Sequence, residues 1–147
     1  MHKDIKILSS NSEKDTENIA FDLAKQIPFG SVICLSGNLG AGKTVFARGF
    51  ARGMGIEDII PSPTFNIVKE YEAANDKWMY HLDLYRISDS DAALAFGIDE
   101  YMNDINAIVL IEWSERIEDI LEPGHIIVNI ERTDKGKRQI KIVQENH

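Results

Sequence analysis

The segment from Gly37 to Thr44 has the residue types and spacing of a phosphate-binding loop, G-x-x-x-x-G-K-[ST]. Small residues in such a loop let backbone N–H groups surround phosphate oxygens at the positive end of a helix dipole. Lys43 then reaches the β- and γ-phosphates, and the Thr44 hydroxyl binds Mg²⁺. A glycine-rich turn that merely joins two elements would need neither side chain. The residues expected to bind nucleotide here are Asn38, Leu39, Gly40, Ala41, Gly42, Lys43, Thr44 and Val45.

Two acidic residues are candidates to hold Mg²⁺ or orient water beside this loop. Glu112 follows five apolar residues, 107–111, as a Walker-B acid follows its strand. Asp83 lies in a segment where alternation places it on the same face as His81 and Tyr85. Each acid has a simpler interpretation. Glu112 could be a solvated strand-end carboxylate, and Asp83 a structural carboxylate with a partner. We expect Thr44, Glu112 and Asp83 to serve the metal.

Thr64 follows two prolines and precedes the next predicted strand, where switch threonines of nucleotide hydrolases reach a γ-phosphate and its metal. An ordinary loop threonine is the alternative. Glu112, Asp83 and Thr64 are therefore the catalytic candidates. His81 is interpreted as a packed histidine without a role in proton transfer, and Trp113 as a core or rim aromatic residue.

The elements that must position these residues alternate between strands and helices. A short apolar strand, 32–35, precedes the loop, and apolar residues at helical spacing follow it until Gly53 and Gly55. Hairpin patterns impose antiparallel pairs on the remaining strands. The fold class expected is α/β, a three-layer fold like that of P-loop nucleotide hydrolases, with a mixed sheet that includes antiparallel hairpins. Further strands are expected near 5–8, 65–71, 78–84, 126–131 and 139–143. One further helix is expected to end near Gln26, and two others are expected near 90–95 and 116–121.

The composition indicates an ordinary globular protein. The 147 residues suit a single domain, 1–147, and the chain is 44% hydrophobic and 27% charged. No apolar run approaches the ~20 residues of a membrane span, and no signal-peptide core is seen at the N-terminus. The lone Cys34 excludes an intrachain disulfide and a zinc site of several cysteines. We therefore expect a cytoplasmic protein with no membrane partner.

The net charge of −8 is concentrated in one stretch. Residues 87–122 hold ten acidic side chains and one basic side chain, Arg116. Nucleic-acid affinity depends on Lys and Arg, so any contact with RNA is expected to pass through a partner. The acidic stretch is a solvated face or a surface for a basic partner. A basic cluster near 132–141 surrounds a predicted hairpin turn. Solvated charges are the simplest interpretation of this cluster, and a contact with nucleotide or with a partner is the alternative.

Four motifs together resemble the TsaE (YjeE) family in order and spacing. They are 35–44, 62–65, 81–86 and 111–116, and the resemblance covers nearly the whole chain. One departure is Asn38, where the family commonly has Asp. The resemblance implies a small bacterial ATPase that uses ATP and Mg²⁺, with low activity alone. It implies Thr44 and Glu112 at Mg²⁺, with Asp83 and Thr64 completing the site.

The same resemblance implies a role with the subunits TsaD and TsaB in threonylcarbamoylation of adenosine 37, in tRNAs that read ANN codons. In that setting the chain would act as a nucleotide-dependent switch on the TsaD–TsaB complex and meet tRNA only through it. A small metabolite kinase and a nucleotide sensor that never hydrolyses ATP remain alternatives.

The adenine is expected to border Ser12, Glu13 and Arg132.

Overall fold

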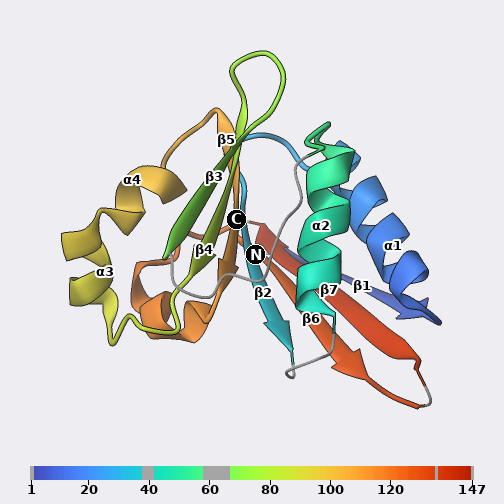
Figure 1. Ribbon diagram of the computed structural model, residues 1–147. Coiled ribbons are helices and arrows are strands. Elements are labelled where there is room, and N and C mark those ends of the chain that lie inside the picture. The colour runs from blue at the N-terminus through green and yellow to red at the C-terminus, as the bar shows by residue number, and fades with distance from the viewer. Residues whose placement is uncertain (1, 38–41, 58–66, 135, 147) are drawn as a thin grey trace.

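One mixed sheet organises the molecule (Figure 1), and its strand order is β1-β7-β6-β2-β5-β4-β3. The computed structural model describes residues 2–37, 42–57, 67–134 and 136–146. Within them, β6, β2, β5 and β4 are parallel to one another, and β1, β7 and β3 join by antiparallel pairing. The mixed sheet with hairpins was predicted and is confirmed. The strands are β1 (His2–Ser10), β2 (Val32–Gly37), β3 (Val68–Glu72), β4 (Trp78–Asp83), β5 (Ala107–Glu112), β6 (Ile126–Arg132) and β7 (Arg138–Asn146).

Helices cover both faces of this sheet, which gives the three layers expected (Figure 1). α1 (Glu13–Gln26) and α2 (Lys43–Gly53) pack on one face. α3 (Ser90–Phe96), α4 (Ile98–Met102) and the 3-10 helix η1 (Ser114–Ile120) lie on the other. Among the described residues, no helix combines the length and apolar character that a bilayer crossing requires.

Alternation along the central strands builds two separate cores. In β5, Leu110 packs toward α1 and α2, whereas its neighbours Val109 and Ile111 pack toward α3, α4 and η1. All six residues of β5 are buried, as expected for a strand with helices on both faces. The strand that carries Glu112 is thus held from both sides.

Local sequence explains most element boundaries. The Ser12 side chain accepts a hydrogen bond from the Asp15 backbone N–H at 3.0 Å, which caps α1, a contact that contributes about 1 kcal/mol. Asn75 and Asp76 adopt positive φ angles of 62° and 59° in the turn between β3 and β4, as hairpin turns require. Two helical segments differ from expectation: α4 was not predicted, and the segment expected to be helical near 116–121 is a 3-10 helix that begins at Ser114.

α1 and α2 pack unusually closely because α2 presents glycine to α1. A Cβ added at Gly49 would lie only 2.3 Å from the Glu17 carbonyl oxygen, which belongs to the rigid backbone of α1. Any side chain at this position must therefore push the two helices apart.

Gly49→Ala is expected to destabilise the protein by roughly 1–3 kcal/mol, the usual cost of overpacking a core. This cost exceeds the ~1 kcal/mol that alanine gains over glycine in helix propensity. Urea unfolding followed by circular dichroism measures the change. Arg48→Ala, at the exposed neighbouring position of α2, is the control and should change stability little. A Gly49→Ala variant as stable as the parent would contradict the close packing.

Candidate functional site

Three parallel strands end at the same edge of the sheet and bring the candidate residues level with one another. Glu112, the last residue of β5, pairs in register with Leu35 of β2 on one side and Asp83 of β4 on the other. The phosphate-binding motif follows β2 directly. Ligands of open α/β sheets bind outside the carboxyl ends of such strands.

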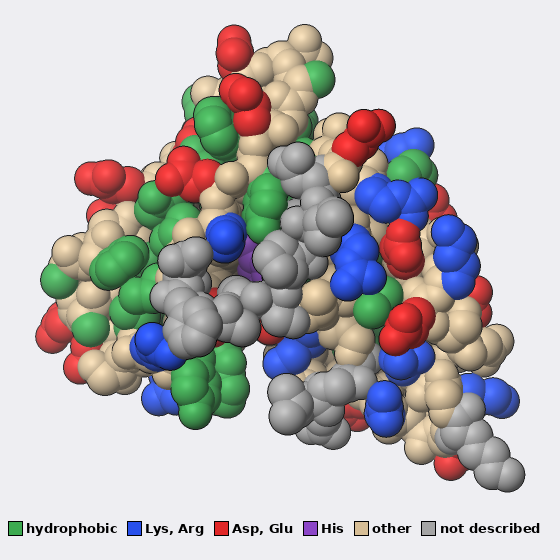
Figure 2. All heavy atoms as spheres, in the orientation of Figure 1, with side chains coloured by type: hydrophobic (Ala, Val, Ile, Leu, Met, Phe, Trp, Pro, Cys, Tyr) green, Lys and Arg blue, Asp and Glu red, His purple; other side chains and the backbone are tan. Residues whose placement is uncertain are grey.

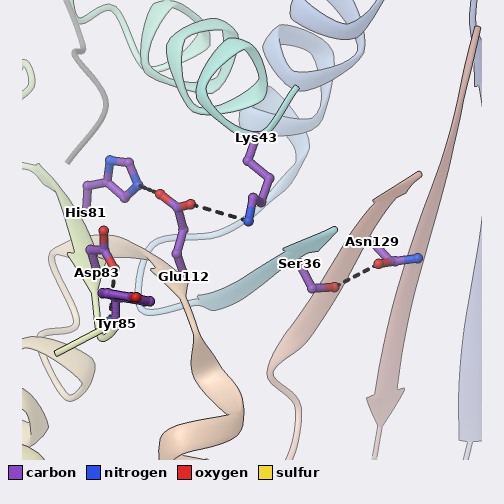
Figure 3. A network of polar contacts seen from close by, with 7 residues as sticks. All are labelled: Ser36, Lys43, His81, Asp83, Tyr85, Glu112 and Asn129. Atoms are coloured by element: carbon purple, nitrogen blue, oxygen red, sulfur yellow. Dashed lines mark hydrogen bonds and ion pairs between the residues drawn. The ribbon is translucent and has the colours of Figure 1, made fainter. Parts of the chain in front are cut away.

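The entrance to the loop is held against β6. A Cβ on Gly37 would lie 2.1 Å from the Ile130 carbonyl oxygen, so only glycine allows this approach. Beside it, Ser36 Oγ donates a hydrogen bond of 3.0 Å to Asn129 Oδ1 (Figure 3). These contacts fix the direction in which the chain leaves β2.

α2 begins at Lys43 with no side chain capping its first turn and no acidic residue in it. Its N-cap is Gly42, which offers no side-chain acceptor to the first N–H groups. Such a helix start presents backbone donors and a positive dipole end, the arrangement that binds phosphate. Thr44 and Val45 lie in this first turn and are partly buried.

Glu112 contacts two cationic or donor groups from different elements (Figure 3). Its Oε2 lies 2.9 Å from His81 Nε2, and its Oε1 lies 3.9 Å from Lys43 Nζ. Only 8% of Glu112 is exposed. A solvated strand-end carboxylate, the simpler interpretation, is therefore wrong for this residue.

Asp83 is half-buried beside this group and accepts a hydrogen bond of 3.0 Å from the Tyr85 backbone N–H. Desolvation raises its pKa above the usual value, and repulsion from Glu112 adds to the rise. The Tyr85 hydrogen bond, His81 and Lys43 oppose the shift without cancelling it. The two carboxyl groups thus interact, and the site does not fully stabilise the charge of Asp83.

The donor set fits Mg²⁺ bound together with phosphate. Among the described residues, no cluster of three or more His, Cys, Asp or Glu side chains could hold a metal alone. Asp83, Glu112 and the Thr44 hydroxyl offer oxygen ligands only. Mg²⁺ in nucleotide sites typically takes one or two carboxylates, several waters and phosphate oxygens, so these groups suit it.

Some predicted residues fall outside the described part of the chain, namely Asn38, Leu39, Gly40, Ala41 and Thr64. The predicted adenine border is described: Ser12 caps α1, Glu13 begins it, and Arg132 ends β6, all three exposed.

Arg138 is a residue that sequence reasoning assigned to a solvated hairpin. The side chain is instead only 8% exposed, and a Cβ on Gly42 would lie 3.3 Å from its Nε. Arg132 pairs with Arg138 across β6 and β7. Arg138 is therefore not a solvated hairpin charge, and it lies beside Gly42 at the start of α2.

An aromatic pair borders the two acids. The rings of Tyr85 and Trp113 meet edge to face with centroids 5.1 Å apart, and 60% and 37% of the two residues are exposed. Trp113 has a φ of 65°, uncommon for a bulky residue, directly after Glu112. This rim-aromatic position was one of the two expected for Trp113.

A hollow of about 480 Å³ lies elsewhere, between the chain entering β2, α4 and the turn before β6. It carries Asp99 and Glu122 in its wall and no lysine or arginine, so it is unsuited to polyphosphate. The carboxyl edge of the sheet remains the candidate site.

Comparison with known proteins shows the family to which this chain belongs. Residues 10–140 match the family model described as "Threonylcarbamoyl adenosine biosynthesis protein TsaE". This chain belongs to the TsaE family. A Bacillus subtilis TsaE protein is 41% identical over 140 residues, which cover 94% of this chain and 84% of that protein. A Rickettsia conorii TsaE protein is 40% identical over 93% of this chain and 77% of its own length.

The TsaE fold is also seen in a crystal structure of Bacillus subtilis YdiB, with a TM-score of 0.83 and 32% sequence identity. The match covers 99% of this chain and 89% of that one. The resemblance noted in the four sequence motifs is therefore confirmed at the level of family and fold.

Asp83→Asn is expected to raise the melting temperature of the nucleotide-free TsaE family member at neutral pH. Because the folded pKa lies above the unfolded one, the contribution of Asp83 to stability falls as pH rises from below about 4 through the folded pKa. The asparagine side chain carries no charge, so the variant does not lose this stability as the pH rises. Thermal unfolding at several pH values measures it.

Asp104→Asn is the control with the opposite sign. The hydrogen bond from Tyr80 Oη, 2.6 Å long, lowers the pKa of Asp104, so its charge stabilises the fold above the unfolded pKa. This variant should lower the melting temperature at neutral pH. Equal shifts in the two variants would contradict the electrostatic difference between the two sites.

Proposed function

We propose that this chain binds ATP with Mg²⁺ and acts as a nucleotide-dependent switch on the TsaD–TsaB complex. That complex would carry out threonylcarbamoylation of adenosine 37 in tRNAs reading ANN codons, in the cytoplasm. The observation that carries the proposal is the place of Glu112, level with the end of the P-loop strand and 3.9 Å from Lys43. Membership of the TsaE family supports the biosynthetic role.

The phosphates would lie against the backbone of 38–42 and the start of α2, with Lys43 on the β- and γ-phosphates. The side chains of Thr44, Glu112 and Asp83 would hold Mg²⁺ directly or through water. Mg²⁺, when bound, neutralises charge that develops on the phosphates during transfer. Glu112 or Asp83 would orient the attacking water, with Thr64 completing the site.

The base is proposed to lie where α1 begins, near Ser12, Glu13 and Arg132. This border adjoins the loop, because a Cβ on Gly42 would lie 3.9 Å from Thr16 Cγ2 in the first turns of α1. Arg138, beside Gly42, adds a positive charge to the same region.

Hydrolysis by the chain alone would be slow. Efficient phosphoryl transfer needs positive charge at the γ-phosphate beyond lysine and metal, often an arginine supplied in trans. A basic partner surface also suits the acidic stretch, whose elements include α3, α4 and η1. In Figure 2, acidic and hydrophobic side chains prevail on the side of α3 and α4, whereas Lys and Arg side chains gather over α1 and α2.

Lys43→Ala should weaken ATP binding by roughly 10- to 100-fold, since hydrogen bonds to charged groups contribute about 1.5–3 kcal/mol. The fold should survive, because Lys43 lies at the site and outside the core. Isothermal titration calorimetry measures the affinity. Lys6→Ala, an exposed lysine of β1, makes the same change in net charge and should leave affinity unaltered. Equal affinity in Lys43→Ala and the parent would overturn the P-loop assignment.

Phosphate release from ATP should be slow for the isolated chain and rise when the TsaD–TsaB pair is added. Association with that pair should also depend on nucleotide, and the partners should change ATP affinity by the same factor as ATP changes partner affinity. Rapid hydrolysis by the lone chain with nucleotide-independent association would defeat the switch. A phosphorylated metabolite would indicate a kinase instead, and ATP binding without phosphate release in the full complex would indicate a sensor.

A further inference from the structure

The buried His81 makes one side-chain hydrogen bond among the described residues, and its partner is Glu112. The residue is 1% exposed in β4, and its Nε2 lies 2.9 Å from Glu112 Oε2. The other ring nitrogen, Nδ1, is buried without a hydrogen-bond partner among the described residues. The one hydrogen bond from the imidazole to the proposed nucleotide site is therefore made by Nε2.

The direction of this hydrogen bond follows from the chemistry of its partners. An ionised carboxylate only accepts hydrogen bonds, so Nε2 must donate. With the hydrogen on Nε2, the buried Nδ1 carries none and needs no acceptor. The ring thus satisfies Glu112 on one side and leaves no buried N–H unpaired on the other.

Burial alone does not require a polar pair at this position. Buried polar pairs are often replaced by well-packed hydrocarbon at no cost, because desolvation offsets the attraction between the partners. A leucine beside Met79 and Leu110, both fully buried on the same face, would suit the core. The histidine is better explained by what it does to Glu112.

The two oxygens of Glu112 have different partners. Oε2 meets the buried ring, whereas Oε1 faces Lys43, whose side chain is partly exposed and carried on a flexible stem. When polyphosphate attracts Lys43, the contact with His81 is the one that remains. Without it, the glutamate side chain could rotate about its own torsions.

We propose that His81 is a positioning residue for Glu112. Its Nε2–H holds one carboxylate oxygen so that the other stays directed at Lys43, where the metal–phosphate group of ATP would bind. The inference rests on the proposed ATP site. It differs from the sequence interpretation, in which His81 merely packs.

Three variants separate positioning from packing. In His81→Gln the side-chain amide nitrogen can occupy the place of Nε2, whereas in His81→Asn it falls at the place of Nδ1 and cannot reach Glu112. His81→Leu fills the core without any donor. Calorimetry should measure ATP affinity with and without Mg²⁺ for each variant and the parent. Phosphate release with TsaD–TsaB gives kcat and KM, and thermal unfolding verifies each fold.

The gain in ATP affinity on adding Mg²⁺ should fall about 10-fold or more in His81→Leu and His81→Asn, the usual effect of removing a group that orients a metal ligand. His81→Gln should retain most of it. ATP affinity without Mg²⁺ should be the same in all four proteins, and kcat should fall more than KM rises. Packing alone predicts no such distinction between Gln and Asn.

Two failures are distinguishable. A parent protein that binds ATP no better with Mg²⁺ overturns the proposed function, and this inference with it. A parent that gains affinity with Mg²⁺, together with a His81→Leu variant that gains equally, overturns the inference alone. If a variant does not fold, ¹⁵N spectra of the nucleotide-free parent decide: the hydrogen on Nε2 supports positioning, and the hydrogen on Nδ1 overturns it.

Discussion

The register of three parallel strands is the constraint on which the candidate site depends. Leu35, Glu112 and Asp83 stand side by side because β2, β5 and β4 pair without a slip. A shift of one residue would turn every side chain of a strand to the opposite face. Glu112 would then point toward α3 and η1, away from Lys43, and an apolar residue would take its place.

Burial on both faces holds that register. Leu110 and Val109 belong to different cores, so a slip of β5 by one residue would mismatch the packing on both faces and turn Glu112 into the apolar core beneath α3 and η1. By packing on both faces of β5, the helices keep Glu112 in its place at the end of that strand. α2 has a second role, because the same helix that packs Phe46 and Phe50 into the core also begins at Lys43 with N–H groups that no side chain caps.

The carboxyl edge does not fully stabilise the charge of Asp83. The two oxygens of Glu112 contact a buried ring and a partly exposed ammonium group, whereas the pKa of Asp83 is raised by desolvation and by its acidic neighbour. The backbone of Trp113 leaves β5 in a left-handed conformation immediately afterwards. Incomplete satisfaction and local strain of this kind are common where a ligand completes the structure.

Sequence patterns alone predict the local features of this protein. The phosphate-loop motif, the strand before it and Glu112 at the end of an apolar strand all rest on patterns within a few residues. Such patterns reflect backbone preferences and side-chain periodicity, which do not need the rest of the fold. The α/β class and the mixed sheet followed from the order of these elements.

Only the tertiary structure decided which distant side chains meet. Alternation predicted the face of His81 but not its contact with Glu112, 31 positions away, because that contact depends on how β4 registers against β5. Arg138 looked like a solvated hairpin residue until the β6–β7 hairpin placed it beside Gly42. Short helices such as α4 have little periodicity of their own and form because neighbouring elements bury Ile98. Periodicity is a local property, whereas pairing is set by the packing of the whole chain.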